Sequence, residues 1–287
     1  MQLTDIGTVK EIMERFGLNF KKKFGQNFLI SRSVPADIAE SCTPDRNCGI
    51  LEIGPGIGTL TRELAARYRK VVAVEIDRDL IPALEYTLAD FDNVKIIEGD
   101  IMKTDVAALC KREFTDAGLR FSVCANLPYY ITTPVIMHLL ESRAGFDYIT
   151  VMIQKEVAAR LCGGAGADDY GAITAAVAYF GKAEKCFNVS AGCFMPAPKV
   201  DSTVMRIQLY DTPPVDVKDE AMLFAVIRGA FAKRRKTLLN SLTGELGGLS
   251  REEINAVLDS AGIEPTVRGE KLSLEDFAKI ANAAAKA

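Results

Sequence analysis

The sequence predicts an α/β fold that is followed by a small all-helical domain. The strongest indication is the stretch from Ile50 to Glu75, where an apolar strand, a glycine turn, a helix-like segment and a second apolar strand follow one another. Strand-like and helix-like segments then alternate as far as residue 153, which is typical of a parallel sheet with right-handed crossovers. After the Pro213–Pro214 pair the apolar residues recur at helical spacing, which indicates a separate helical domain.

The N-terminal part is expected to contain an amphipathic helix and then a basic segment. Val9, Ile12 and Phe16 recur at helical spacing. Residues 15–36 contain five basic residues and no acid. This segment is either a solvated basic loop or one that touches phosphate and cofactor together. Three consecutive lysines are its candidate RNA contacts: Lys21, Lys22 and Lys23.

Five strands are expected near residues 50–53, 71–75, 94–98, 121–125 and 148–153. Gly54, Gly56 and Gly58 follow the first strand and would let the backbone turn sharply and approach a ligand closely. Glu75 ends the second strand, where a carboxylate can accept hydrogen bonds from both hydroxyls of a ribose. Since the carboxyl ends of parallel strands share one edge of the sheet, we expect a ligand site there.

The glycine motif reads E-x-G-x-G-x-G, with Glu52 inside the strand end, and differs from the G-x-G-x-x-G of dinucleotide enzymes. It resembles the motif of class I S-adenosylmethionine methyltransferases, which bind a nucleoside with a charged amino-acid tail and no pyrophosphate. Asp100 follows the third strand at the same edge, where it can accept from an adenine amino group. A helix N-cap is the alternative role for Asp100.

The fourth strand runs directly into the most specific chemical motif of the chain: Asn126, Leu127, Pro128 and Tyr129. An exocyclic aromatic amine is a poor nucleophile because its lone pair is delocalised into the ring. The Asn126 amide oxygen can polarise such an amine by accepting a hydrogen bond from it, and Pro128 shapes the turn that aims the acceptor. Tyr129 offers a flat face to a base taken out of its stack. The alternative is a strand-ending turn with a packed tyrosine.

The composition argues against several other kinds of chemistry. A net charge of −3 does not suit a broadly basic nucleic-acid binder. His138 is the only histidine and the seven cysteines form no C-x-x-C pair, so we expect no metal site, no Ser-His triad and no histidine base. Neither a leader pattern nor an apolar run of the roughly 18 residues that a membrane span needs is present. We expect a soluble, cytoplasmic monomer with reduced cysteines.

Two domains are expected, formed by residues 1–211 and residues 212–287. Near the end of the first, Phe194 lies among prolines, either as a hydrophobic anchor or as a second aromatic face opposite Tyr129. The second domain should contain helices near 219–231, 235–243, 250–261 and 273–285. Residues 221–244 hold five basic residues and no acid, which indicates a solvated helix face or an RNA-binding stripe. Four of the five are consecutive: Lys233, Arg234, Arg235 and Lys236.

Blocks between residues 21 and 242 together resemble the small-subunit ribosomal RNA adenine N6,N6-dimethyltransferases, the KsgA type. They include KKFGQNFL, EIGPGIGTLT, NLPYYITTP and AFAKRRKTLLNSL, in that family's order. The resemblance implies a class I methyltransferase fold, Rossmann-like, with a seven-stranded sheet that has one antiparallel strand and a small helical C-terminal domain. It also implies dimethylation of two adjacent adenines in the 3′-terminal hairpin loop of small-subunit rRNA, within an assembling subunit.

The same resemblance assigns roles to individual residues. The lysine-rich N-terminal segment is implied to close over the cofactor, and Tyr129 and Phe194 to enclose the target adenine. S-adenosylmethionine is implied to be held by six residues: Asn27, Leu29, Gly54, Glu75, Asp100 and Asn126. The block around Phe194 departs mildly from the family pattern, because Cys193 stands where alanine is expected, and this bears on local packing only.

Two other functions remain open from the sequence. A large-subunit rRNA methyltransferase of the erythromycin-resistance type shares the core chemistry, although AFAKRRKTLLNSL looks like the KsgA type. A ribosome-assembly factor on the same fold would bind without catalysis, but the intact Asn126, Glu75 and Asp100 argue against lost activity. A DNA adenine methyltransferase is a third and weaker alternative, since such an enzyme would usually carry D-P-P-Y or N-P-P-Y.

Overall fold

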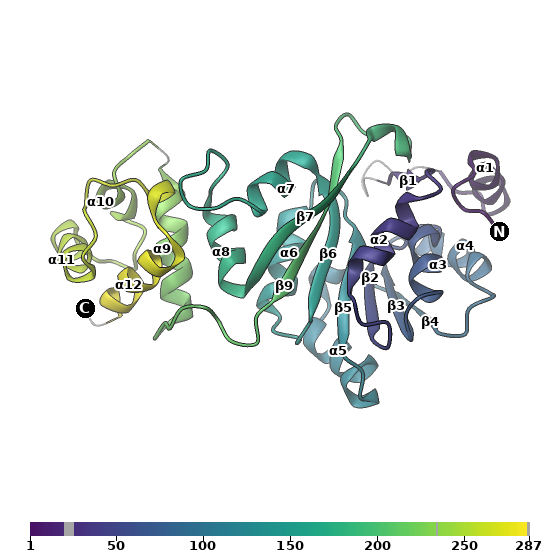
Figure 1. The fold of residues 1–287 in the computed structure, drawn as a ribbon, viewed down its shortest axis with the longest axis horizontal. Helices are drawn as coiled ribbons and strands as arrows, with labels where there is room; N and C mark the ends of the chain where they lie inside the picture. The colour runs from purple at the N-terminus through teal and green to yellow at the C-terminus, as the bar shows by residue number, and fades with distance from the viewer. Residues whose placement is uncertain (20–25, 234, 286–287) are drawn as a thin grey trace. The chain divides into compact units, whose positions relative to one another are not determined.

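The computed structural model describes residues 1–19, 26–233 and 235–285 (Figure 1). The chain forms two compact units, one of Met1–Ala158 with Glu184–Leu209 and one of Ala159–Ala183 with Tyr210–Ala287. Residues 159–183 therefore belong with the C-terminal helices, although they precede the boundary that we expected after residue 211. The assignment of RNA binding to residues 212–287 stays a proposal.

A seven-stranded sheet with the order β4-β3-β2-β5-β6-β9-β7 forms the centre of the first unit. The first five of these strands run parallel to their neighbours, whereas β9 is antiparallel to β6. This arrangement confirms the predicted seven-stranded sheet with an antiparallel strand, and the five strands expected from the sequence are present to within one residue at each end. The strands are β2 Gly49–Ile53, β3 Lys70–Glu75, β4 Val94–Glu98, β5 Phe121–Asn126, β6 Tyr148–Gln154, β7 Gly181–Val189 and β9 Ser202–Leu209.

A separate two-stranded ladder joins distant parts of the sequence. Strand β1, Phe28–Leu29, pairs antiparallel with β8, Phe194–Met195, so that Leu29 lies beside Phe194. Neither short strand carries a periodic signal, and the ladder was not predicted. It places the N-terminal segment next to the block that contains Phe194.

Helices also lie before and between these strands along the chain. The N-terminal helix α1 was predicted, and Val9 and Ile12 are the residues that it buries. Its first turn is capped by the Asp5 side chain, which accepts from the Thr8 backbone N–H at 2.9 Å. The helices are α1 Ile6–Arg15, α2 Val34–Cys42, α3 Thr59–Ala65, α4 Ile81–Thr87, α5 Val106–Glu113, α6 Thr132–Glu141 and α7 Lys155–Leu161.

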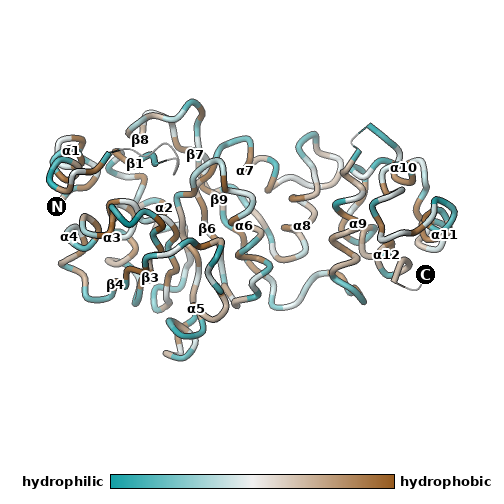
Figure 2. Tube along the Cα trace, turned by 180° about the vertical axis from the view of Figure 1, so that it is seen from behind, coloured by the Kyte–Doolittle hydropathy of each residue, from teal (hydrophilic) through white to brown (hydrophobic). Residues whose placement is uncertain are grey.

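Helices α2 and α3 cover one face of the sheet. The buried cluster there joins Ile38 of α2 and Leu64 of α3 to Ile50, Val71 and Cys124 of the strands. The inner strands β2, β3, β5 and β6 are buried along nearly their whole length and read as near-continuous apolar runs, whereas the edge strands β4 and β7 are partly exposed. Figure 2 colours the chain by this hydropathy. Cys42, Cys48, Cys110 and Cys124 are buried thiols, as expected, whereas Cys162, Cys186 and Cys193 are half-buried. Among the described residues, no helix has the length and apolarity that crossing a membrane requires.

The second unit is helical. The four helices predicted for it are confirmed. A capping box precedes each of the last two, Ser250–Glu253 at α11 and Ser273–Asp276 at α12. Helix α8 was not predicted, because its mainly apolar sequence lacks a clear period. The helices are α8 Ala172–Phe180, α9 Glu220–Ala232, α10 Leu238–Leu242, α11 Arg251–Ala261 and α12 Leu274–Ala284.

Candidate active site

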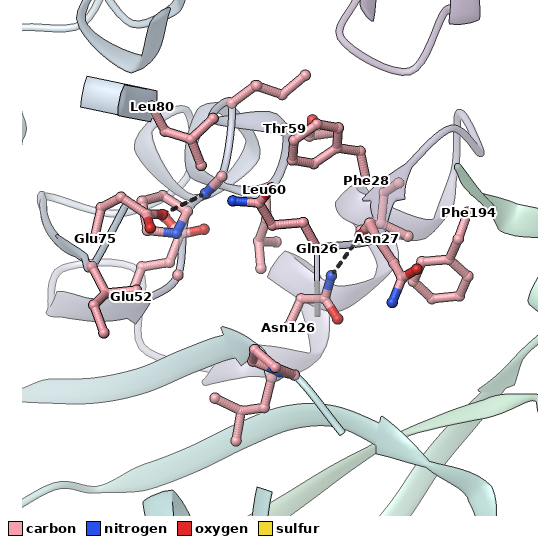
Figure 3. A pocket seen from close by; sticks show the side chains of 18 of the residues that line it. Gln26, Asn27, Phe28, Glu52, Thr59, Leu60, Glu75, Leu80, Asn126 and Phe194 are labelled. Atoms are coloured by element: carbon pink, nitrogen blue, oxygen red, sulfur yellow. Dashed lines mark hydrogen bonds between the residues drawn. The ribbon is translucent and has the colours of Figure 1, made fainter. Parts of the chain in front are cut away.

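A pocket lies at the carboxyl ends of β2, β3 and β5 (Figure 3), the edge expected for a ligand in such a sheet. It brings together most of the residues singled out from the sequence. Those that line it are Asn27, Leu29, Gly54, Glu75, Asn126, Leu127, Pro128, Tyr129 and Phe194. Glu52 and Glu75 lie together at one end of the pocket, Asn27 and Phe194 at the other, and Asn126 between them (Figure 3).

The turn between β2 and α3 needs glycine. Gly54 and Gly56 have φ angles of +68° and +62°, in the left-handed region that side chains disfavour. A Cβ on Gly56 would also lie only 3.3 Å from the Phe28 ring. The turn therefore keeps the backbone at the pocket free of side chains, so a ligand can approach it closely.

Glu75 is held rigidly at the end of β3. Its side chain is only 4% exposed. One carboxyl oxygen accepts from the Asp77 backbone N–H at 2.8 Å and the other from the Gly56 backbone N–H at 3.1 Å. Burial raises the pKa of Glu75, and these two N–H groups oppose that effect. The carboxyl thus ties the glycine turn to the neighbouring strand end while it faces the pocket.

The N-terminal segment packs across the pocket through contacts with both sides of the site. Gln26 Nε2 donates to Asp77 Oδ2 at 2.8 Å, beside the Glu75 end. The Asn126 side-chain N–H donates to the Asn27 carbonyl oxygen at 3.5 Å. Together with the β1–β8 ladder, these bonds explain why Asn27 and Leu29 reach the pocket. The predicted RNA contacts Lys21, Lys22 and Lys23 lie outside the described residues.

The motif after β5 forms a tight turn that begins the approach to α6. The Leu127 backbone N–H donates to the Met152 carbonyl at 3.2 Å, and the Pro128 carbonyl accepts from the Ile131 N–H at 3.2 Å. The Tyr129 hydroxyl is hydrogen-bonded to the buried Ser202 hydroxyl at 2.6 Å. Burial raises the pKa of Tyr129, so it stays a neutral phenol. Ser202 therefore holds the tyrosine ring in place, a contact that sequence reasoning missed.

Phe194 and Asp100 each have a structural role beside the ligand contact predicted for them. Phe194 lines the pocket but is only 4% exposed, because most of its surface packs in the cluster that includes Leu29. Asp100 is not among the pocket-lining residues. Its carboxylate accepts from the Met102 backbone N–H at 3.0 Å, the capping role that we had considered as an alternative. The proposed contacts of both side chains with ligands stay predictions.

Some pocket residues were not selected from the sequence as site residues. Glu52 was noted only as a member of the glycine motif, although its carboxyl lines the pocket. Its position before the first glycine is the signal that would have found it. The remaining unselected residues contribute mainly apolar or backbone surface, and they include Phe28, Leu60, Ile76 and Leu80.

A known protein family matches almost the whole chain. The model of the ribosomal RNA adenine dimethylases matches residues 17–286. The chain belongs to the ribosomal RNA adenine dimethylase family. The sequence left a large-subunit methyltransferase of the erythromycin-resistance type open as an alternative, so individual relatives bear on the choice between the two.

Curated relatives of this adenine dimethylase favour the small-subunit type. The "Ribosomal RNA small subunit methyltransferase A" of Geobacillus thermodenitrificans is 48% identical, over 96% of this chain and 95% of that protein. The protein of that name from Streptococcus thermophilus is 43% identical, over 99% of this chain and 98% of the relative. The resemblance stated from the sequence is thereby confirmed.

Solved structures also resemble this adenine dimethylase. A dimethyladenosine transferase from Plasmodium falciparum has a TM-score of 0.73 at 25% identity, covering 88% of this chain and 95% of that one. The 23S rRNA methyltransferase ErmE has a TM-score of 0.65 at 26% identity, covering 90% of this chain and 100% of that one. The fold is therefore shared by a dimethyladenosine transferase and by a 23S rRNA methyltransferase.

Proposed function

We propose that this protein methylates N6 of two adjacent adenines in the 3′-terminal hairpin loop of small-subunit rRNA, with S-adenosylmethionine as methyl donor. The substrate would be rRNA within an assembling small subunit. The observation that carries the proposal is the position of the Asn126–Tyr129 motif, which shares one pocket with the glycine turn and Glu75. The full-length similarity to small-subunit methyltransferases supports this choice of RNA.

The residues of the pocket fit the proposed cofactor. The positive φ angles of the glycine turn leave room for a nucleoside, and the Glu75 carboxyl suits ribose hydroxyls. Asn27 and Leu29 would cover the ligand, and Asp100 would accept from its adenine amino group. When bound, the cofactor supplies an electrophilic methyl group on a positively charged sulfonium.

The chain's own contribution to the chemistry centres on Asn126. Because its amide N–H is directed to the Asn27 carbonyl, its amide oxygen is left to accept from the N6 amine of the target adenine. That hydrogen bond makes the amine more nucleophilic. Tyr129, held by Ser202, and Phe194 would contact the faces of the base. The only histidine, His138, contacts the Thr104 carbonyl at 3.3 Å, so proton removal would rely on other acceptors.

Replacing Glu75 by alanine should weaken S-adenosylmethionine binding by about 1.5–3 kcal/mol, the range for hydrogen bonds that involve a charged group. Calorimetry of the folded variant measures this. Glu98→Ala is the matched control, because Glu98 lies beside Glu75 in the sheet but ion-pairs with Arg78 and does not line the pocket. If the two variants bind S-adenosylmethionine with equal affinity, Glu75 does not contribute to cofactor binding.

The basic stripe is the proposed RNA contact of the second unit. Lys233, Arg235 and Lys236 are exposed, and Arg234 lies outside the described residues. The Lys233 ammonium also donates to the Thr243 carbonyl at 3.1 Å. Each phosphate contact contributes about 0.7–0.9 to the slope of log affinity against log salt. Replacing all four by alanine should therefore lower this slope by about 2–3 if three of them touch phosphate.

Binding of small subunits across a salt series measures that slope. Lys233→Ala alone should leave it nearly unchanged, because Lys233 is engaged within its own unit. Cofactor affinity should also stay constant in the fourfold variant. An unaltered slope in that variant would mean that the stripe is a solvated helix face.

A methylation assay tests the proposal as a whole. Labelled S-adenosylmethionine is incubated with under-methylated small subunits, naked small-subunit rRNA or large subunits, and the modified base is mapped. We expect N6,N6-dimethyladenine at two adjacent positions near the 3′ end of small-subunit rRNA. Label in the large subunit alone would indicate the erythromycin-resistance activity, and no label in any RNA would indicate a non-catalytic assembly factor.

A further inference from the structure

Tyr130 is a large aromatic side chain that the fold leaves in solvent beside the pocket. It is 62% exposed, the highest value among the exposed large hydrophobic residues that the structure describes. Within those same parts of the chain, its ring and hydroxyl have no hydrogen-bond or ring partner. Its neighbour Tyr129, in contrast, lines the pocket and is bonded to Ser202. The site motif is therefore followed directly by a second tyrosine that no contact within the described chain accounts for.

The position of Tyr130 is fixed by the turn that also places Tyr129. The Ile131 backbone N–H donates to the Pro128 carbonyl at 3.2 Å, which closes a turn with the two tyrosines at its centre. The Thr132 hydroxyl donates to the same carbonyl at 3.2 Å and joins the turn to the start of α6. Because the Cα atoms of consecutive residues lie about 3.8 Å apart, the two side chains start from neighbouring points at the edge of the pocket.

The surface around this turn carries balanced charges. Tyr129 is bonded to the start of β9, and the Lys155 backbone N–H, after the end of β6, donates to the Asp201 carbonyl at 3.0 Å. These contacts bring the ends of β5 and β6 and the start of β9 together. Their exposed side chains include two lysines, Lys155 and Lys199, and two carboxylates, Glu156 and Asp201. Since opposite charges offset one another here, stacking on an aromatic ring is a stronger contact for RNA on this surface than attraction of phosphate.

We propose that Tyr130 binds the base next to the target adenine, by stacking, while the target itself occupies the pocket. This inference rests on the proposed function, because it requires an RNA substrate at the Asn126–Tyr129 motif. A base that is taken out of its stack leaves its neighbour with an uncovered face, and enzymes that extrude a base set their substrate choice partly through the flanking nucleotides. An aromatic side chain replaces the lost stacking partner. In a pair of adjacent adenines each is the neighbour of the other, so Tyr130 holds one while the other reacts.

Single-turnover methylation of under-methylated small subunits, across a range of subunit concentrations, tests this role. Tyr130→Ala should raise the half-saturating subunit concentration about 10-fold, within the range for the loss of one stacked base. The rate at saturation should fall much less, since Tyr129 still contacts the target. Tyr130→Phe keeps the ring and should stay within about twofold of the wild type. Tyr210→Ala is the matched control and should have no effect, because Tyr210 is 42% exposed but follows the far end of β9.

The identity of the neighbouring base provides a second test. Subunits are reconstituted with rRNA in which one of the two adenines is replaced by uridine, whose smaller ring stacks more weakly. With these subunits Tyr130→Ala should raise the half-saturating concentration only about threefold or less, because both changes remove the same contact and are not additive. The effect of Tyr130→Ala on unaltered subunits should persist at high salt, in contrast to that of the basic stripe, because stacking neutralises no phosphate.

The possible failures are distinguishable. If Tyr130→Ala saturates at the wild-type subunit concentration, or if its effect is equally large with the uridine-containing subunits, the role of Tyr130 is wrong and the proposed function is untouched. An effect that disappears at high salt would overturn stacking as the contact. Cofactor affinity and unfolding temperature are measured for the same variant, and a loss of either would mean that the side chain supports the fold instead. If the wild type transfers no methyl group to any RNA, the proposed function fails, and the inference with it.

Discussion

Replacing Phe194 by alanine should lower the free energy of unfolding of the first unit by about 3–5 kcal/mol, the range for a buried phenylalanine. The ring is 4% exposed and packs in the cluster that joins Leu29 to α2 and α3. Its loss would leave a cavity at the β1–β8 ladder and loosen the segment that carries Asn27. Urea unfolding followed by circular dichroism measures the effect.

Phe194→Leu separates packing from stacking. Leucine keeps most of the apolar volume, so the loss of stability should be much smaller than for alanine. It removes the aromatic face, so binding of the target base should still weaken by about 1–3 kcal/mol, the range for base–aromatic stacking. If the alanine variant unfolds at the same urea concentration as the wild type, Phe194 is not a core residue. If the leucine variant binds RNA normally, Phe194 is only an anchor.

Replacing Asn126 by alanine should lower the single-turnover rate of methyl transfer by about 100-fold or more, similar to the loss of one electrostatic group at a reacting centre. The amide oxygen is the acceptor that the site offers to the target amine, and its orientation depends on the bond from the amide N–H to Asn27. Rapid-quench measurement at saturating RNA and cofactor isolates this step from binding.

Asn126→Asp is the matched control, because aspartate keeps an acceptor oxygen and loses the donor to the Asn27 carbonyl. It should retain more activity than alanine if polarisation of the amine matters most. Cofactor affinity is measured for both variants, since Asn126 lines the part of the pocket near Asn27. A normal transfer rate in Asn126→Ala would disprove the polarisation mechanism.

Local patterns were sufficient to predict most of the fold. The valine-rich run of β3 and the glycines after β2 determine short-range backbone conformations, which depend on a few neighbouring residues. The Asn126–Tyr129 motif likewise follows directly from the end of one strand. For these reasons the strand positions were predicted correctly, and the alternation of elements was enough to indicate the parallel sheet. Of the catalytic and cofactor candidates, all but Asp100 line one pocket.

The sequence by itself determined the strands, the glycine turn and the candidate residues that lie at the carboxyl ends of the strands. Only the tertiary structure decided which distant segments complete the site. Leu29 pairs with Phe194, and Tyr129 bonds to Ser202, although no periodic signal links either pair. The unsatisfied carboxyl of Glu52 is also a tertiary property, because burial and hydrogen-bond partners depend on what packs around a strand end. Such contacts are set by packing between elements far apart in the chain, which local residue patterns do not encode.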